Sequence, residues 1–331
     1  MTLTTETPSA ATRVELLRLM VMARQLDAVI ASVDPHFHCS YGEEAVPVGC
    51  FKALRPTDIS MSHYRSGLLT SMVRGVDLRR LIAGALGKVT GPGRGRSRAA
   101  LMGDVGPNHF AMFSGTLGPT LGLAAGAALA AKLEGSGRVA VVTFGDGTVN
   151  SGLFHESMNL AGMLRLPVVF VCQDNQYAIT MKAEVAIAGS ILQRGSGYGM
   201  PAVEVDGNDA VAVFSAVLAA TNRARVGEGP SFIHALSYRL GGHWATDPAA
   251  YRSEDEVRCW AAREPISRLA KSLVAEGVIG PTALQEMEDR ELSEAKAALA
   301  LAEADPWPGA EEIEGDAYAP SHYAQVGSSN G

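Results

Sequence analysis

The stretch VAVVTFGDGTVN, residues 139–150, decides the fold of this 331-residue chain. Its first half, Val139 to Phe144, is a continuous apolar segment, which is typical of a strand buried on both faces of a parallel sheet. The strand ends in Gly145-Asp146-Gly147, and a helical pattern follows. Ligands of open α/β sheets bind outside the carboxyl ends of the strands. We therefore expect Asp146 at the rim of a binding crevice, between glycines that leave room for a bulky ligand.

The flanking segments alternate between helix and strand and predict an α/β fold, with a mostly parallel sheet and helices on both faces. One domain is expected over residues 13–304, between a flexible N-terminal arm (1–12) and an extended C-terminal tail (305–331). A glycine-rich loop is expected at 87–113. The predicted strands are 139–144, 168–172, 203–205 and 232–236. The predicted helices are 14–33, 44–54, 78–86, 116–132, 153–164, 209–225 and a closing pair at 254–277 and 282–303.

Composition and charge exclude several classes of protein. With 47% hydrophobic and 19% charged residues the chain is of the folded, globular type, and a net charge of −7 argues against a nucleic-acid partner. The apolar run at 117–131 is interrupted by glycine and proline and is shorter than the roughly 20 residues that span a bilayer, so no membrane association is expected. Four widely spaced cysteines without a CxxC pair argue against structural zinc and disulfides. Because the N-terminus has no apolar signal segment, a cytoplasmic location is expected.

Polar residues end the next predicted strand as well. The segment PVVFVC, residues 167–172, leads into Gln173-Asp174-Asn175-Gln176-Tyr177. A right-handed crossover would place this carboxyl end beside that of the first strand. Asp146 and Asn175 would then offer a carboxylate and an amide oxygen to one Mg²⁺, which takes few protein ligands and keeps positions for phosphate oxygens. Gly-Asp-Gly alone is also a common turn, and the strand context favours a diphosphate site.

The order GDG, 26 intervening residues and DN, followed by QYAI, resembles the thiamine-diphosphate motif. More closely, residues 12–318 resemble the α subunits of 2-oxo acid dehydrogenase E1 components, which include pyruvate, branched-chain and acetoin enzymes. The matching stretches are YGEEAVPVG (41–49), HYRSG (63–67), GPGRGRS (91–97), GTLGPTLGLAAG (115–126), YGMPAVEVDGND (198–209), YRLGGHWATDPAAYRSEDEV (238–257) and EADPWP (303–308).

This resemblance implies thiamine diphosphate and Mg²⁺ as cofactors. It implies Asp146, Asn175 and the backbone carbonyl of Tyr177 as metal ligands, and His243 as a catalytic histidine close to the diphosphate and the reacting centre. The implied cofactor-binding residues are Tyr64, Arg65, Gly115, Leu117, Gly145, Asp146, Gly147, Asn175, Tyr177 and His243. Among them, Tyr64 and Arg65 match a cofactor-contacting pair, and Gly115 and Leu117 match positions that hold the aminopyrimidine ring.

The implied activity is that of an oxidoreductase acting on 2-oxo acids. The enzyme would decarboxylate a small 2-oxo acid and pass the acyl unit to a lipoyl group of an E2 protein. The family's catalytic Glu comes from a β subunit, so the chain would act only in an α₂β₂ assembly. The Gly/Ala-rich helix at 116–132 would serve such an interface, or pack within the subunit.

Three positions depart from the family pattern. Ala99 stands where the glycine-rich loop usually carries a histidine, and Ser66 follows the Tyr-Arg pair where another histidine is common. Trp244 replaces a phosphorylatable serine. His63 and His109 are the candidates to replace the missing imidazoles in space.

These departures keep two alternatives open: a split, two-subunit thiamine-dependent decarboxylase or carboligase of the transketolase-like type, and a non-catalytic cofactor-binding subunit. The cluster of His36, His38 and Cys39 is interpreted as a loop or subunit contact, and His155 as a packing or surface residue. Loops 88–113 and 238–255 are expected to order when cofactor binds.

Overall fold

Six parallel strands form the centre of the computed structural model, in the order β2-β1-β3-β4-β8-β7. The structure describes residues 7–96, 103, 104, 106, 108–110 and 115–310. The strands are β1 (Ile59–Met61), β2 (His109–Phe110), β3 (Ala140–Gly145), β4 (Val168–Asp174), β7 (Ala202–Asp206) and β8 (Ser231–Leu236). A separate antiparallel hairpin joins β5 (Tyr177–Ala178) to β6 (Met181–Lys182). The predicted parallel sheet is confirmed, although β1 and β2 are too short to have given a periodic signal.

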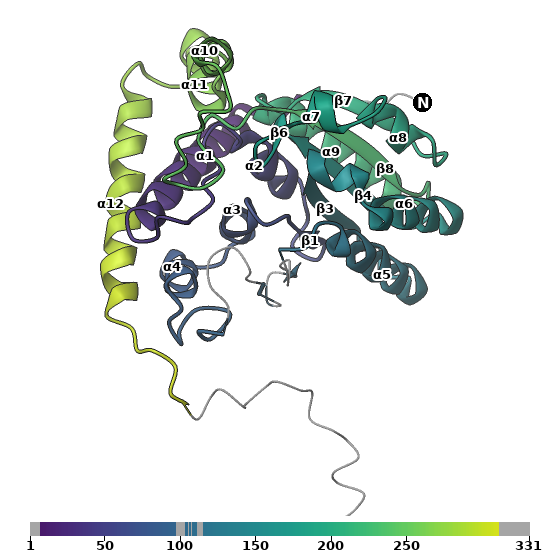
Figure 1. Cartoon of the computed structure of the whole chain (residues 1–331), viewed down its shortest axis with the longest axis horizontal. Helices are drawn as coiled ribbons and strands as arrows, with labels where there is room; N and C mark the ends of the chain where they lie inside the picture. The colour runs from purple at the N-terminus through teal and green to yellow at the C-terminus, as the bar shows by residue number, and fades with distance from the viewer. Residues whose placement is uncertain (1–6, 97–102, 105, 107, 111–114, 311–331) are drawn as a thin grey trace, which may run out of the picture.

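Helices cover both faces of this sheet, as predicted (Figure 1). On one face Val142 and Phe144 of β3 pack with α5 (Pro119–Glu134), α6 (Gly152–Leu164) and α8 (Ile191–Ser196). On the other face Val141 of β3 packs with α2 (Ala45–Lys52) and α9 (Ala210–Arg225). Successive side chains of a strand point to opposite faces, and both faces are covered, so every residue of the strand core is apolar or small.

A third group of helices builds a core of its own beside the sheet. It contains α1 (Ala10–Ala31), α3 (Gly67–Val73), α4 (Leu78–Leu86), α11 (Pro265–Ala275) and α12 (Ala283–Glu303). Figure 1 shows the long α12 along one side of the molecule, next to α1. The remaining short elements are the 3₁₀ turn η1 (Asp146–Asn150) and the helix α7 (Ala183–Ala186).

The helices near the C-terminus differ from the closing pair that the sequence predicts. The first predicted member, 254–277, is two helices, α10 (Glu254–Ala261) and α11. Pro265 has no backbone N–H to continue a helix and stands at the first turn of α11. The Glu264 carboxylate accepts hydrogen bonds from the backbone N–H groups of Ile266 and Ser267 and so caps the new helix.

The boundaries of the predicted domain remain a prediction. Helix α1 begins at Ala10, ahead of the expected start at residue 13, because the Ser9 hydroxyl accepts a hydrogen bond from the N–H of Thr12. Residues 1–6 and 311–331 lie outside the described residues. Among the helices of the described ranges, none combines the length and apolar character that crossing a bilayer requires.

His109 in β2 makes the stability of the fold pH-dependent. Its ring is fully buried, and its Nδ1 lies 3.1 Å from the Ser60 hydroxyl. Burial, together with the charge of Arg74, lowers the pKa of His109 to about 4. The unfolded imidazole has a pKa near 6.5. Between these values the unfolded state binds one proton more, so the stability present above pH 6.5 is lost as the pH falls.

We therefore expect His109→Gln to reduce the pH dependence of the unfolding free energy between pH 6.5 and pH 4 by about 1.4 kcal/mol per pH unit. Urea unfolding at pH 7.5, 6 and 5 measures this slope. His36→Gln is the matched control, because His36 is exposed. Equal slopes in His109→Gln and the unchanged protein would show that folding does not lower the pKa of His109.

Candidate active site

The pairing of β3 with β4 brings the predicted site residues to one edge of the sheet. Gly145, the last residue of β3, lies opposite Gln173 in β4. Asp146 and Asn175 therefore follow neighbouring strands at the same end, as the sequence predicts. The end of β8 is adjacent, since Asp174 lies opposite Leu236. This edge is where open α/β sheets bind ligands.

Asp146 is a buried carboxylate with an incomplete set of partners. It opens the turn η1 directly after β3, and its side chain is 2% exposed. Among the described residues, no group hydrogen-bonds to its Oδ2. Burial, and then the negative charges of Asp174 and Glu43, raise the pKa of Asp146 to about 7. A divalent cation would supply the missing partner and the missing positive charge, so this carboxylate fits a metal ion.

Asn175 lies in a strained turn beside it. The turn contains two non-glycine residues with left-handed backbone, Gln176 (φ 72°) and Ile179 (φ 57°). The Asp174 carboxylate supports the turn, because its Oδ1 accepts from the backbone N–H of Gln176 at 3.1 Å and from the Gln176 side-chain amide at 2.9 Å. Such strain persists where surrounding contacts enforce it, and it is common at functional sites.

The side chain of Asn175 has a defined orientation. Its Nδ2 donates to Glu43 Oε2 at 2.9 Å, while its Oδ1 accepts from the N–H of Tyr177 at 3.1 Å. The carbonyl of Tyr177 accepts from Arg239 at 3.3 Å. A carbonyl oxygen has two lone pairs, so one remains for a further ligand. No cluster of three or more His, Cys, Asp or Glu side chains suited to a metal occurs within the described part of the chain. The predicted set combines a carboxylate, an amide and a backbone carbonyl.

His243 belongs to a second group of side chains. Its Nδ1 lies 3.0 Å from Nη2 of Arg65 and 3.4 Å from Nη1 of Arg239. Arginine has only donors, so Nδ1 accepts and the ring proton is on Nε2. Burial, followed by the charges of Arg65 and other neighbours, lowers the pKa of His243 to about 3. The imidazole is therefore neutral near pH 7.

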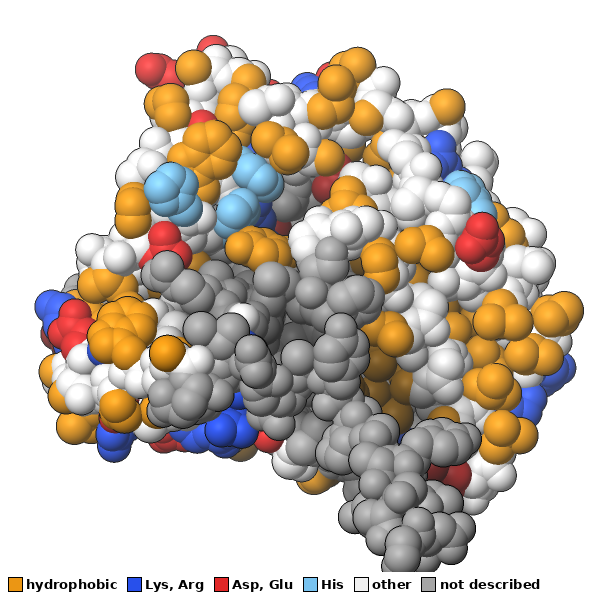
Figure 2. Space-filling model, turned by 60° about the horizontal axis from the view of Figure 1, so that its bottom comes forward, with side chains coloured by type: hydrophobic (Ala, Val, Ile, Leu, Met, Phe, Trp, Pro, Cys, Tyr) orange, Lys and Arg blue, Asp and Glu red, His pale blue; other side chains and the backbone are white. Residues whose placement is uncertain are grey.

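Tyr64 and Arg65 are part of the same group. The ring of His38 contacts both Tyr64 and His243 edge-on, with centroid distances of 4.8 and 4.6 Å. Arg65 is buried and donates to the carbonyl of Cys39 at 2.8 Å. Histidine side chains lie close together on the face drawn in Figure 2. The structure thus brings Tyr64, Arg65 and His243 together.

Of the other predicted residues, Gly147 and Leu117 lie close together at the GDG turn. A Cβ atom placed on Gly147 would be 2.9 Å from the Cβ of Ala178 and 3.5 Å from Cδ1 of Leu117, so only glycine fits without displacement. Leu117 is 48% exposed, just before α5. Gly115 and Gly145 have open space where a Cβ would be.

The proposed substitutes for the missing histidines separate in the structure. His63 Nε2 lies 3.0 Å from Gln173 Oε1, at the edge that carries Asp146 and Asn175. His109 instead pairs with Ser60 in β1, away from that network. Ala99 lies in the segment 97–102 of the glycine-rich loop, which is outside the described residues. His155 hydrogen-bonds Tyr198 at 2.6 Å, which agrees with a packing role.

Several residues of this site carry no local signal in the sequence. Glu43 is fully buried and contacts Asn175, and Arg239 is fully buried between the turn at 175–179 and the loop that carries His243. The expectation for His38 is a loop or subunit contact; it lies in a loop, and its ring packs on that of His243. Glu43 and Arg239 stand in the stretches YGEEAVPVG and YRLGGH, and no local pattern shows which residues they contact.

The loop at 238–255 is held by its own polar contacts. The Asp247 carboxylate accepts from the N–H of His243 at 2.6 Å and from the Tyr251 hydroxyl at 2.8 Å. Trp244 contacts the ring of His243 edge-on at 5.9 Å. The expectation that this loop orders when cofactor binds stays a prediction.

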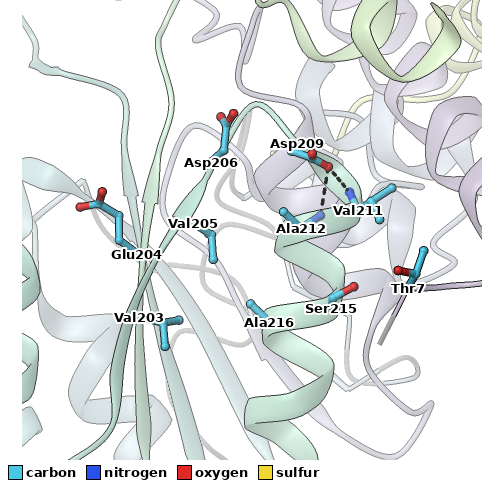
Figure 3. Close-up of a pocket in the computed structure, with 10 residues that line it drawn as sticks. All are labelled: Thr7, Val203, Glu204, Val205, Asp206, Asp209, Val211, Ala212, Ser215 and Ala216. Carbon is cyan, nitrogen blue, oxygen red and sulfur yellow. Dashed lines mark hydrogen bonds between the residues drawn. The ribbon is translucent and has the colours of Figure 1, made fainter. Parts of the chain in front are cut away.

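A hollow of about 550 Å³ lies at the far edge of the sheet, between β7 and α9 (Figure 3). Figure 3 shows Val203 and Val205 pointing toward α9 and Glu204 to the opposite side of the strand. Asp209 caps α9, and Asp206 accepts hydrogen bonds from Arg263 and Arg268. These two carboxylates are therefore engaged in structural contacts.

The fold and the site define an α/β protein with a buried carboxylate, Asp146, at the carboxyl edge of its sheet and a neutral histidine, His243, in the loop after β8. Residues 12–311 match the model of the family described as "Dehydrogenase E1 component", and the chain belongs to this family.

Three relatives are α subunits. One is the α subunit of mitochondrial 2-oxoisovalerate dehydrogenase from Mus musculus, 38% identical over 72% of this chain and 54% of that protein. Another is the pyruvate dehydrogenase E1 component α subunit from Porphyra purpurea, 33% identical over 83% of this chain and 82% of that protein. The third is the α subunit of acetoin:2,6-dichlorophenolindophenol oxidoreductase from Bacillus subtilis, 36% identical over 85% and 84%. The match spans about half of the mouse protein.

Arg239 should hold the turn at 175–179 and the loop that carries His243 in place together. It donates to the carbonyls of Tyr177 and Ile179 and to the Tyr251 hydroxyl. Lysine has three donors and no planar fork. We expect Arg239→Lys to lower the unfolding free energy by roughly 2–3 kcal/mol, because buried acceptors lose their partners. Hydrogen exchange should accelerate at both 175–179 and 240–252.

Urea unfolding and exchange mass spectrometry measure these effects. Arg138→Lys is the matched control: Arg138 pairs with Glu134 on an exposed helix end, and its change should stay within about 0.5 kcal/mol. Faster exchange in only one of the two segments would refute the idea that Arg239 links them.

Proposed function

We propose that this chain is the α subunit of a thiamine-diphosphate-dependent 2-oxo acid dehydrogenase, active with a β subunit. The observation that carries the proposal is the buried Asp146 carboxylate at the carboxyl edge of the sheet, near Asn175. One of its oxygens has no hydrogen-bond partner among the residues that the structure describes. The family match and the names of the relatives support the 2-oxo acid chemistry.

Asp146, Asn175 and the carbonyl of Tyr177 would hold Mg²⁺, and the metal would hold the diphosphate. Gly145 and Gly147 would let the phosphates approach the turn η1. Arg65 and Tyr64 would contact the cofactor, and Gly115 and Leu117 would support its pyrimidine ring. When bound, thiamine diphosphate supplies the electron sink that lets a 2-oxo acid lose carbon dioxide.

His243 would act as a hydrogen-bond donor at this site. Its Nδ1 faces Arg65 and Arg239, which leaves the Nε2 proton for a phosphate oxygen or a reacting group. A neutral imidazole flanked by two cations donates this hydrogen bond without being protonated itself. A negatively charged diphosphate nearby would raise the pKa of His243 and allow it to move protons.

Partners and location are part of the proposal. The inner side of α5 packs in the core, while Leu123 of α5 and Leu160 and Met163 of α6 are exposed. This apolar outer side suits a contact with a β subunit or a second α subunit in an α₂β₂ assembly. Transfer of the acyl unit to a lipoylated E2 is the expected next step. The cytoplasmic location stays a prediction, because the mouse relative is named as mitochondrial.

Asp146→Asn should abolish the magnesium-dependent binding of thiamine diphosphate. The variant keeps the side-chain shape but removes the charge that a divalent cation requires. We expect carbon dioxide release to fall by at least about 100-fold in the complex with the β subunit, since a metal and its diphosphate are lost together. Asp209→Asn, at the cap of α9, is the control and should leave cofactor binding unchanged.

The same complex distinguishes the alternatives. Carbon dioxide release coupled to reduction of lipoamide, measured with pyruvate and with branched-chain 2-oxo acids, supports the dehydrogenase. Carbon dioxide release with acyloin formation and no lipoamide reduction supports a carboligase. Full activity of Asp146→Asn would instead indicate a non-catalytic subunit.

A further inference from the structure

We propose that Glu43 is a positioning residue that sets the amide orientation of Asn175, so that the amide oxygen is presented to the metal. The inference rests on the proposed function, since it concerns the same metal site. No local sequence pattern indicates this role, and Glu43 itself is not among the proposed ligands.

The carboxylate of Glu43 accepts hydrogen bonds from two side-chain amides. It is fully buried, and its Oε2 accepts from Gln173 Nε2 at 2.8 Å and from Asn175 Nδ2 at 2.9 Å. An ionised carboxylate only accepts hydrogen bonds, so both amides must turn their NH₂ groups toward it. The oxygen of each amide then faces the opposite way.

The orientation of Gln173 is fixed from both ends. Its Oε1 accepts from Nε2 of His63 at 3.0 Å, while its Nε2 donates to Glu43. Asn175 has the equivalent arrangement, with Oδ1 accepting the N–H of Tyr177 and Nδ2 donating to Glu43. Without Glu43, the amide of Asn175 would lose one of the two contacts that distinguish its nitrogen from its oxygen, and only the N–H of Tyr177 would still favour this orientation. A flipped amide would present NH₂ to the cation, which repels it.

Glu43 also lies close to Arg65, which contacts His243. Its Oε1 lies 3.5 Å from Nε of Arg65, and Arg65 contacts His243 through Nη2. The residue is held at the start of α2 by a hydrogen bond from its own N–H to the Ser40 carbonyl at 2.7 Å. One carboxylate, in the turn just before α2, thus links the amide that would face the metal to the arginine that contacts His243.

A buried Glu43–Arg65 ion pair could also serve stability alone. The two roles differ in what they require of residue 43. Positioning requires a hydrogen-bond acceptor facing Asn175 and Gln173, whereas an ion pair requires a negative charge. Glutamine keeps an acceptor oxygen and loses the charge; methionine has a similar size and loses both.

The experiment compares Glu43→Gln with Glu43→Met in the full chain, purified with its β subunit. The probe is Mn²⁺ in the presence of thiamine diphosphate, and electron paramagnetic resonance reports free Mn²⁺. Loss of a partner that orients a metal ligand typically lowers metal affinity about 10–100-fold. We expect Glu43→Met to raise the Kd for Mn²⁺ about 10–100-fold, and Glu43→Gln to stay within about threefold of the unchanged complex.

The neighbouring residue provides the matched control. Glu44 is also fully buried, but it pairs with Arg24 at 2.8 Å and accepts from the N–H of Gly42. Glu44→Met removes an equally buried charge away from the metal site. It should lower the melting temperature and leave the Kd for Mn²⁺ unchanged. If Glu43→Met does not fold, Glu43→Asp takes its place with the same expectation, because it withdraws the carboxylate by one methylene.

Three outcomes overturn the inference. Equal loss of affinity in Glu43→Gln and Glu43→Met would show that the charge is what matters. Unchanged affinity in both would show that Glu43 does not orient the ligand, while the proposed function stands. Absence of Mn²⁺ binding in the unchanged complex with thiamine diphosphate would overturn the proposed function itself, and the inference with it.

Discussion

The parallel pairing of β3 with β4 is the constraint on which the candidate site depends. It places the end of β3 level with Gln173, so that Asp146 and Asn175 leave the sheet side by side. Both strands are buried on both faces, and a shift of register would move each side chain to the opposite face and disrupt the packing against the helices there. The chemistry at the edge is therefore fixed by the hydrophobic core beneath it, and not by attraction between the polar groups themselves.

Charge is concentrated at this edge in a way that core packing alone does not explain. Glu43, Arg65, Asp146, Asp174 and Arg239 are all buried there. Buried charges are costly unless they are paired. Arg65 and Glu43 face each other, while Asp146 keeps an oxygen without a hydrogen-bond partner in the described structure. The buried carboxylates thus outnumber the buried arginines at this edge, and a bound cation would neutralise the excess negative charge. On the other side, His38 and His243 are kept neutral by burial and by the neighbouring arginines.

Much of the fold was predictable because its signals are local. The apolar runs at 139–144 and 168–172 need both faces covered, and the helices between them repeat with helical spacing. Prediction failed where a signal was short or competed with another. β1 and β2 span three and two residues. Pro265 divides a helical pattern that apolar spacing alone continues, and the cap by Glu264 shows why the new helix begins there.

The strand-end motif is readable in the sequence, because Gly-Asp-Gly and Asp-Asn stand at the ends of apolar strands that a right-handed crossover makes neighbours. The cofactor followed from the resemblance of this motif to the thiamine-diphosphate motif. Only the tertiary structure decided which side chains surround that motif. Glu43 lies far from Asn175 in sequence yet hydrogen-bonds to it, and His38 meets His243 across most of the chain. Such contacts depend on how α2, β4 and the loop after β8 pack together. The local sequence pattern does not indicate this packing, because the packing is fixed by the shape of the whole core.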